Sequence, residues 1–290
     1  MKKSVTQCTV RLRGKKMVLS KFANKSFVTR LISGIVLVGL MLATIIPGGT
    51  VLFVANMLIS LVGVYELYKV MGLEKSLPGV TGYVATISYY ALLFTQKTQY
   101  ITILFIVFLI ALLAQYVFMF PQYKTEQVSN AIMCMLYAGV LLSYIYIVRE
   151  GNNGAYTVWL IFLCSWASDT CAYVAGVAFG KHKMAPVLSP KKSIEGAVGG
   201  VVGAAVLGAV YAAVFIDKIQ LSVNPVMVFA VICAVGALIS MVGDLAASAI
   251  KRNHDIKDYG TLIPGHGGIM DRFDSVIYVA PIIWILLQIF

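Results

Sequence analysis

Charged residues are scarce in this chain of 290 residues. Only 12% of the residues are Asp, Glu, Lys or Arg, whereas 60% are hydrophobic. Soluble domains have about 25% charged and roughly 45–50% apolar residues, so this chain has too few charges to cover a soluble globule of its size. The high hydrophobicity also excludes an intrinsically disordered chain. The composition therefore indicates an integral membrane protein.

Three other absences narrow the class. The apolar runs lack the polar–apolar alternation of a transmembrane β-barrel, which favours an all-α polytopic membrane protein. The five cysteines form no C-x-x-C pair, so neither a disulfide framework nor a zinc site is predicted. Acids are few, and the net charge is +11. Without an aromatic-basic RNA motif or a helix-turn-helix pattern, this excess predicts contact with anionic membrane lipids and no nucleic-acid partner.

The apolar runs are long enough to cross a membrane several times. A helix needs about 20 apolar residues to span the hydrocarbon core. We predict nine membrane-spanning helices, at about residues 29–46, 50–66, 79–95, 100–120, 128–148, 155–179, 194–216, 224–250 and 273–290.

The basic residues predict the orientation of these helices. If the N-terminus is inside, the only basic residues outside are Lys97, Arg149 and Lys218. Cytoplasmic loops are rich in Lys and Arg, so we predict an inside N-terminus and an outside C-terminus in the inner (cytoplasmic) membrane of the cell. The first apolar run lacks an A-x-A-like cleavage site after it, which favours a retained helix over a signal peptide.

The chain then divides into three regions. Residues 1–28 form a basic cytoplasmic segment, 29–150 the N-terminal transmembrane helices, and 151–290 a C-terminal transmembrane catalytic region. Most polar residues of the last region lie in the predicted cytoplasmic loops 180–193 and 251–272. Any chemistry should therefore take place on the cytoplasmic face.

One polar group surrounds the first of these loops. Asp169 lies inside an apolar run, and an acid at membrane depth is costly, so it is a functional candidate. A neutral acid or an interhelical hydrogen bond is the alternative. Lys191 and Lys192 directly precede Ser193, a predicted N-cap whose helix end could face an anion. Anchoring of lipid headgroups is the alternative for the lysines.

Closely spaced glycines follow Ser193. The pairs Gly196/Gly200 and Gly199/Gly203 are each four residues apart, so each pair shares one helix face. Such pairs let helices approach closely. We interpret them as packing residues and not as a phosphate-binding loop, because no strand followed by Gly-Lys-Ser/Thr is present.

The second polar group is denser. Asp244, Ser248, Lys251 and Arg252 share one face of the predicted eighth helix. A glycine-rich segment follows, and Asp271-Arg272-Phe273-Asp274 closes the loop. Carboxylates suit Mg²⁺, Lys and Arg suit phosphates, and glycines let backbone N–H groups approach an anion. This pattern predicts metal-assisted chemistry on a phosphorylated substrate, although ordinary loop charges are the alternative for single members.

These residues resemble the signature of the phosphatidate cytidylyltransferase (CDP-diacylglycerol synthase) family. The similarity is carried by Ser248-Ala249-Ile250-Lys251-Arg252, Lys257-Asp258, Gly260, Pro264-Gly265-His266-Gly267-Gly268 and Asp271-Arg272-Phe273-Asp274, without a gap. Upstream, Ser168-Asp169-Thr170, Gly180-Lys181 and Ser189-Pro190-Lys191-Lys192-Ser193 are also similar to that family. The resemblance covers roughly residues 160–275, and the first 150 residues match only in hydropathy.

The resemblance implies a reaction in which CTP and phosphatidic acid give CDP-diacylglycerol and pyrophosphate. It implies that Asp244 and Asp271 bind Mg²⁺, with a second cation such as K⁺ as an option, and that the active site faces the cytoplasm. The implied catalytic residues are Asp244, Asp271, Lys251, Arg252 and Ser248. The implied substrate-binding residues are Lys191, Lys192, Ser193, His266, Gly267, Gly268, Arg272 and Asp169.

Other functions remain open from the residues alone. An ion-coupled carrier could use Asp169 and Asp244, although no internal repeat supports it. A CTP-dependent polyprenol or phytol kinase would share CTP but attack its γ-phosphate. A CDP-alcohol phosphotransferase would require Asp-Gly-x-x-Ala-Arg, which is absent. Faces of small residues permit a homodimer.

Overall fold

The computed structural model describes residues 25–219, 221 and 223–290. Among these residues, nine helical segments are long and apolar enough to cross a membrane, as the sequence predicts. The chain is therefore a multi-pass membrane protein. Most of the predicted basic segment 1–28 lies outside the described residues.

Seven of the segments are continuous helices. They are α2 (Lys25–Ile45), α3 (Gly49–Val70), α4 (Leu77–Phe94), α5 (Ile101–Phe118), α10 (Ile194–Val214), α11 (Pro225–Asn253) and α12 (Met270–Ile289). Two helix ends differ from the prediction in ways that affect the site. Helix α3 continues past Glu66 to Val70, and α12 begins at Met270, so Asp271 lies in its first turn.

The fifth and sixth segments are interrupted helices. In the fifth, α6 (Thr125–Cys134) and α7 (Tyr144–Glu150) are joined by a wide π-type turn, Met135–Val140, and a tight turn, Leu141–Ser143. In the sixth, α8 (Gly154–Phe162) continues through the π-type turn Leu163–Ala167 into α9 (Ser168–Phe179). Turns of the π type are rare in proteins, and those that occur are often found at functional sites. The second one directly precedes Ser168 and Asp169.

Local capping explains where several helices begin. The Ser193 side chain accepts a hydrogen bond from the Gly196 amide at 3.2 Å, which confirms the predicted N-cap of α10. Asn224 caps α11 in the same way through the amide of Val226, at 2.9 Å. Side-chain oxygens at this position satisfy amides that lack a partner within the helix.

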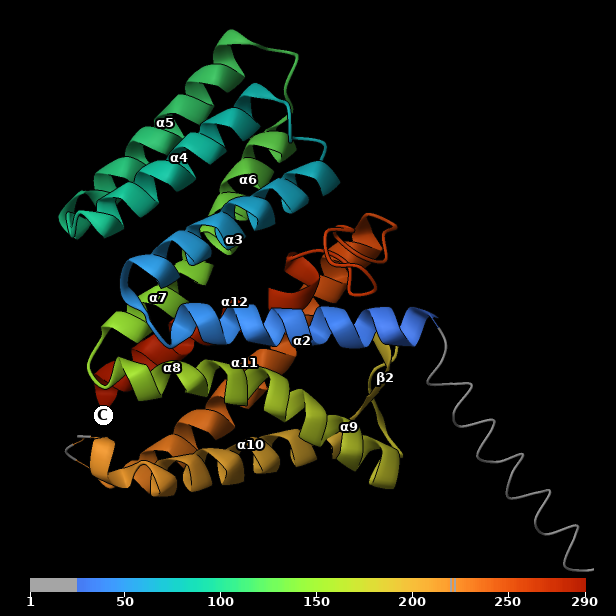
Figure 1. Ribbon diagram of the computed structural model, residues 1–290. Helices are drawn as coiled ribbons and strands as arrows, with labels where there is room; N and C mark the ends of the chain where they lie inside the picture. Colours follow the sequence, from blue (N-terminus) through green and yellow to red (C-terminus); the bar gives the residue numbers. More distant parts are fainter. Residues whose placement is uncertain (1–24, 220, 222) are drawn as a thin grey trace, which may run out of the picture.

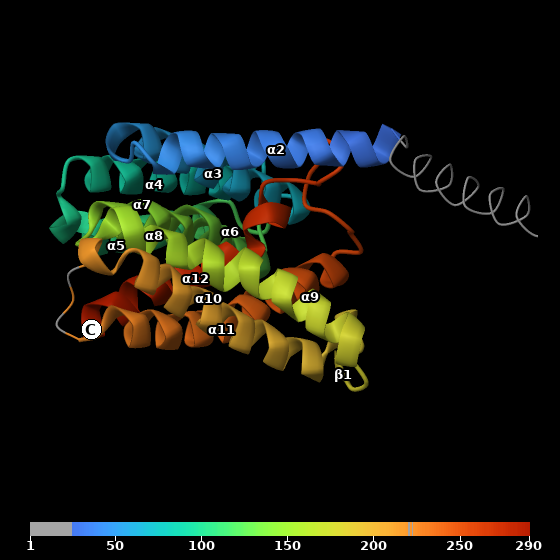
Figure 2. The same ribbon diagram turned by 60° about the horizontal axis from the view of Figure 1, so that its bottom comes forward.

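The helices form two groups that meet along α12. Figure 1 shows α3 to α6 in the upper part and α8 to α11 in the lower part, with α7 and α12 between them. Helix α2 crosses in front of the other helices in Figure 1 and lies along the upper edge of the molecule in Figure 2. Its side chains are mostly exposed, as expected for a helix that faces lipid.

The glycines of α10 pack against neighbouring helices, as predicted. A Cβ atom at Gly196 would lie 2.8 Å from the carbonyl oxygen of Ala172 in α9. A Cβ atom at Gly208 would lie 2.8 Å from the carbonyl oxygen of Phe229 in α11. Both distances are too short for a real contact, so these positions allow the close approach of three helices.

The loop 180–193 contains a two-stranded sheet, which the all-α prediction did not include. Strand β1 (Lys183–Ala185) pairs antiparallel with β2 (Ser189–Ser193). Glu195 ties the base of this hairpin to α10, because it accepts hydrogen bonds from the amides of Lys181 at 3.0 Å and His182 at 3.2 Å. A short hairpin in a basic loop has no long alternating pattern, so the sequence did not reveal it.

The polar segments that the sequence analysis singled out lie at one end of the molecule. The start of α2, the hairpin and the segment between α11 and α12 share one end, while the C-terminus lies at the other (Figures 1 and 2). The two loops predicted to be cytoplasmic are therefore on the same side of the helical bundle.

Candidate active site

Helices α11 and α12, the loop between them and the sixth segment line an open polar cavity of about 320 Å³. Five carboxylates and two cations face it, together with Trp166 and Ser275. The charged residues are Asp169, Asp244, Asp258, Asp271, Asp274, Lys251 and Arg272. The predicted pair Asp244 and Asp271 therefore lines one cavity. We call it the acidic cavity.

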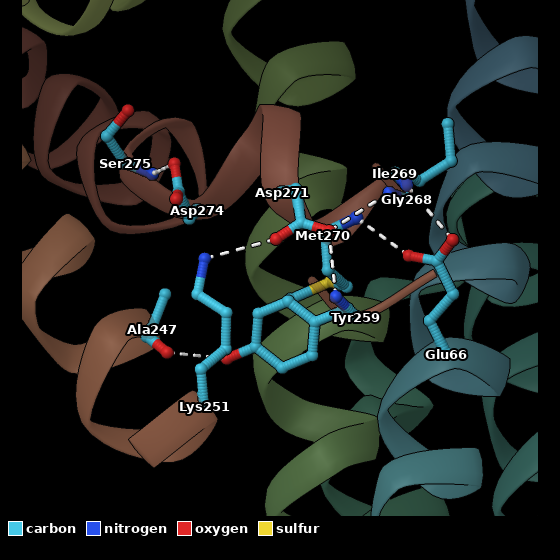
Figure 3. A network of polar contacts seen from close by, with 10 residues as sticks. All are labelled: Glu66, Ala247, Lys251, Tyr259, Gly268, Ile269, Met270, Asp271, Asp274 and Ser275. Atoms are coloured by element: carbon cyan, nitrogen blue, oxygen red, sulfur yellow. Dashed lines mark hydrogen bonds and ion pairs between the residues drawn. The ribbon is translucent and has the colours of Figure 1, made fainter. Parts of the chain in front are cut away.

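Asp271 is the most firmly held of these acids. Its side chain is only 2% exposed. One oxygen, Oδ1, lies 3.1 Å from Lys251 Nζ, and the other, Oδ2, accepts hydrogen bonds from the amides of Tyr259 at 2.8 Å and Gly268 at 2.9 Å (Figure 3). Charge-assisted hydrogen bonds of this kind are roughly twice as strong as neutral ones. The contacts fold the loop between α11 and α12 around one carboxylate.

Tyr259 fastens the same loop to α11. Its hydroxyl donates a hydrogen bond to the carbonyl oxygen of Ala247 at 2.9 Å, and Lys251 Nζ lies 5.3 Å from the centre of its ring (Figure 3). Burial, and next the charge of Asp271, raise the pKa of the Tyr259 phenol above its ordinary value. The hydroxyl therefore stays protonated and serves as a hydrogen-bond donor.

Asp244 connects α11 to the hairpin. Its Oδ2 forms an ion pair with Lys192 Nζ. Both residues also line a second cavity of about 490 Å³ between α9, α10, α11 and the hairpin. The residues of this second cavity are Asp169, Ala172, Tyr173, Gly176, Val177, Lys183, Met184, Lys191, Lys192, Ser193, Gly196, Ala197, Met241 and Asp244. We call it the hairpin cavity. Asp169 and Asp244 line both cavities and mark their junction.

Other predicted residues lie around the cavities. Gly267 and Gly268 pack against Asp271: Gly268 donates its amide, and a Cβ atom at Gly267 would lie 2.7 Å from Asp271 Oδ2. Among the described residues, those that line the two cavities do not include Ser248, Arg252 or His266. Roles of these three in substrate binding or catalysis stay predictions.

Sequence reasoning gave Asp274 no role of its own and did not single out Glu66. Asp274 belongs to the quoted signature and its spacing from Asp271 places it one turn further along α12, where it lines the acidic cavity. Glu66 of α3 is 4% exposed and accepts hydrogen bonds from the amides of Ile269 and Met270 at 3.0 and 2.9 Å. A lone acid near the end of an apolar run was the available signal for Glu66.

The carboxylate oxygens of the acidic cavity are the type of ligand that Mg²⁺ prefers. Among the described residues, no group of three His, Cys, Asp or Glu side chains is arranged to hold a metal alone. Mg²⁺ commonly binds one or two carboxylates and completes its shell with water and substrate phosphates, so two acids at one cavity are sufficient. Arg272 Nε is buried and has no hydrogen-bond partner among the described residues, so it can donate to an anion.

Comparison with known proteins decides the family. Residues 28–290 match the cytidylyltransferase family. This chain belongs to that family. It is similar to the phosphatidate cytidylyltransferases of Staphylococcus haemolyticus (strain JCSC1435), with 31% identity over 89% of this chain and 98% of the relative, and of Staphylococcus aureus (strain COL), with 31% identity and the same coverage. The protein of that name from Staphylococcus epidermidis (strain ATCC 12228 / FDA PCI 1200) is 30% identical over the same shares.

The family match includes every residue that lines the two cavities. It also includes α3 and therefore Glu66, although the resemblance visible in the signature begins only near residue 160. The N-terminal helices thus belong to the cytidylyltransferase fold.

Proposed function

We infer that this chain is a phosphatidate cytidylyltransferase, a nucleotidyltransferase that makes CDP-diacylglycerol for phospholipid synthesis. The match to relatives of that name over 98% of their length carries this conclusion. In the reaction, a phosphate oxygen of phosphatidic acid attacks the α-phosphorus of CTP. The bond between the α-phosphorus and the oxygen bridging to the β-phosphate breaks, and pyrophosphate leaves.

The acidic cavity suits this chemistry. The nucleophile is already ionised at neutral pH, so no strong general base is required. Catalysis then depends on positioning two polyanions and on neutralising their charge. Lys251 and Arg272 are the basic residues that line the cavity, and we assign both to phosphate binding. The Nε atom of Arg272 has no hydrogen-bond partner among the described residues, so it is free to donate to a phosphate.

The same cavity is the proposed metal site. Asp244 and Asp271 would bind Mg²⁺, which polarises a phosphate when bound. Lys192 and Lys251 form ion pairs with these two acids, so each acid has a cationic partner from the chain itself. A second cation such as K⁺ stays a prediction.

The two cavities suit the two substrates. The acidic cavity is almost wholly polar, and we assign it to the triphosphate of CTP. The hairpin cavity combines Lys183, Lys191 and Lys192 with apolar side chains such as Val177 and Met241, and it lies between membrane-spanning helices. This mixture suits a lipid phosphate with its glycerol, so we assign the hairpin cavity to phosphatidic acid. The two phosphates would then meet beside Asp169 and Asp244.

We further propose that this end of the molecule faces the cytoplasm of the cell, where CTP is present. The support is that the hairpin lysines, the loop after α11 and the basic turn after α3 all lie on the side that the positive-inside rule assigns to the cytoplasm. A homodimer stays a prediction. Gly196 and Gly208 of α10 already contact α9 and α11 and are not available for it.

The test is turnover by the purified protein in detergent with phosphatidic acid, Mg²⁺ and CTP labelled at either the α- or the γ-phosphate. We expect the α-label in the lipid and release of pyrophosphate. Transfer of the γ-label would indicate a lipid kinase instead. Ion flux in proteoliposomes without CTP turnover would indicate a carrier.

A further inference from the structure

The first turn of α12 is held by two carboxylates from different parts of the chain. Three consecutive amides, those of Gly268, Ile269 and Met270, point out of the beginning of this helix. The first donates to Asp271 at 2.9 Å, and the next two donate to Glu66 at 3.0 and 2.9 Å (Figure 3). Amides at a helix start have no partner within the helix and favour negative charge. Glu66 therefore fixes the segment from which Asp271 projects.

Two glycines of the signature make room for the Glu66 carboxylate. A Cβ atom at Gly268 would lie 2.5 Å from Glu66 Oε2, and a Cβ atom at Gly260 would lie 2.9 Å from Glu66 Cδ. Real Cβ atoms essentially never come this close to another heavy atom. Because both carboxylate oxygens are hydrogen-bonded, the side chain cannot move aside without losing those bonds. The glycine-rich segment is thus shaped around Glu66.

The contacts of Glu66 at the start of α12 account for the burial of its carboxylate. A buried carboxylate is costly unless it is hydrogen-bonded or paired. Glu66 is 4% exposed, and its carboxylate accepts hydrogen bonds from the amides of Ile269 and Met270 at the start of α12, while no described residue of α3 lines either cavity. A hydrophobic residue would serve packing of α3 at lower cost. We therefore interpret the carboxylate at position 66 as a hydrogen-bond acceptor for the signature segment at the start of α12.

We propose that Glu66 is a positioning residue for cytidylyl transfer. It holds the backbone at residues 268–270, so that Asp271, Arg272 and Asp274 enter the acidic cavity in a fixed arrangement. The proposal rests on the site proposed above. Helix α2 also contacts the loop between α11 and α12, because Ser33 Oγ donates a hydrogen bond to the carbonyl oxygen of Pro264 at 2.9 Å. The N-terminal helices thereby contribute to the geometry of a site to which they supply no cavity residue among those described.

The informative substitution is Glu66→Gln, which keeps the size of the side chain. Glutamine offers one acceptor oxygen and an NH₂ group, so one of the two amides at the start of α12 loses its partner. Residues that orient metal ligands through hydrogen bonds typically affect metal affinity or activity by about 10–100-fold. We expect kcat to fall by about that factor and the half-saturating Mg²⁺ concentration to rise. The KM for phosphatidic acid should stay within about twofold of wild type.

Glu150→Gln is the matched control. Glu150 Oε1 accepts a hydrogen bond from the Gly49 amide at 2.8 Å, at the opposite end of the same helix α3. A general loosening of α3 would affect both variants. An effect specific to the site would leave Glu150→Gln with wild-type activity.

Two measurements on the metal-free protein provide readouts besides activity. Hydrogen exchange in a peptide covering residues 259–272 should become faster in Glu66→Gln and stay unchanged in Glu150→Gln. The second measurement is the unfolding temperature in detergent. Gly268→Ala should lower this temperature in the wild-type protein, and the decrease should be smaller in a Glu66→Ala background, where the carboxylate is gone. Additive effects of the two substitutions would contradict the contact on which the proposal depends.

The outcomes separate this proposal from the site itself. If Asp271→Asn is inactive while Glu66→Gln keeps wild-type kcat, Mg²⁺ dependence and exchange, Glu66 has no positioning role and the site stands. If Asp271→Asn is fully active, the site assignment is wrong and the role of Glu66 in cytidylyl transfer is wrong with it. Slower turnover, a higher half-saturating Mg²⁺ concentration and faster exchange confined to Glu66→Gln would establish the role.

Discussion

Lys192 of the hairpin forms an ion pair with Asp244 of α11, at the junction of the two cavities. The contact joins a loop and a helix that are far apart in the sequence. It places one cation and one carboxylate where the phosphates of both proposed substrates would meet. A second such pair, Lys251 with Asp271, lies in the acidic cavity. The proposed site therefore contains two ion pairs whose members could exchange partners with phosphates and a metal ion.

The first prediction concerns the two proposed metal ligands. Asp244→Asn and Asp271→Asn should each reduce Mg²⁺-dependent incorporation of α-labelled CTP into lipid by at least about 100-fold, because the amide removes the negative charge that binds the cation. Membrane insertion and the elution profile in detergent should be retained. Turnover similar to wild type in either variant would contradict the metal assignment.

The second prediction compares two lysines of the same loop region. Lys251 lines the acidic cavity and contacts Asp271, whereas Lys257 is exposed and lines neither cavity among the described residues. Lys251→Ala should therefore lower kcat/KM for CTP by about 10–100-fold, as expected for loss of a charged contact worth about 1.5–3 kcal/mol. Lys257→Ala should change it by less than about threefold. The reverse order would show that the face shared by Asp244 and Lys251 does not form the site.

The third prediction separates the substrates of the two cavities. Lys183 and Lys191 line the hairpin cavity and not the acidic one. Their replacement by Ala should raise the KM for phosphatidic acid severalfold and leave the KM for CTP nearly unchanged. Arg272→Ala should do the opposite, because Arg272 lines the acidic cavity and its Nε has no hydrogen-bond partner among the described residues. Equal effects on both substrates would refute the division, and steady-state kinetics in mixed micelles would measure it.

The sequence predicted the parts of the site that depend on spacing within one element. Asp244 and Lys251 are seven residues apart, and a helix places them on one face, which the acidic cavity confirms. The cap at Ser193 was predictable for the same reason. The contact of Glu66 with Ile269 and Met270 was not, because it joins the second helix to the last and leaves no local pattern.

Backbone irregularities were also invisible in the sequence. The π-type turn Leu163–Ala167 precedes Asp169 without a proline or glycine to mark it. The turn depends on packing between helices, and propensity is only a weak prior that such tertiary context overrides. The hairpin that carries Lys192 is short and mostly polar, so it too lacked a signal.

The last prediction tests the packing that brings the cavity walls together. In an exposed helix, Gly→Ala is favourable by about 1 kcal/mol because it restricts the unfolded chain. At Gly39 of α2, a Cβ atom would meet nothing within 4 Å, so Gly39→Ala should keep or raise the unfolding temperature. At Gly208, the Cβ atom would lie 2.8 Å from the backbone oxygen of Phe229, which cannot move without shifting α11. Overpacking of this kind costs about 1–3 kcal/mol, so Gly208→Ala should lower the unfolding temperature in detergent. If both variants respond alike, the close contact between α10 and α11 is not what stabilises this part of the fold.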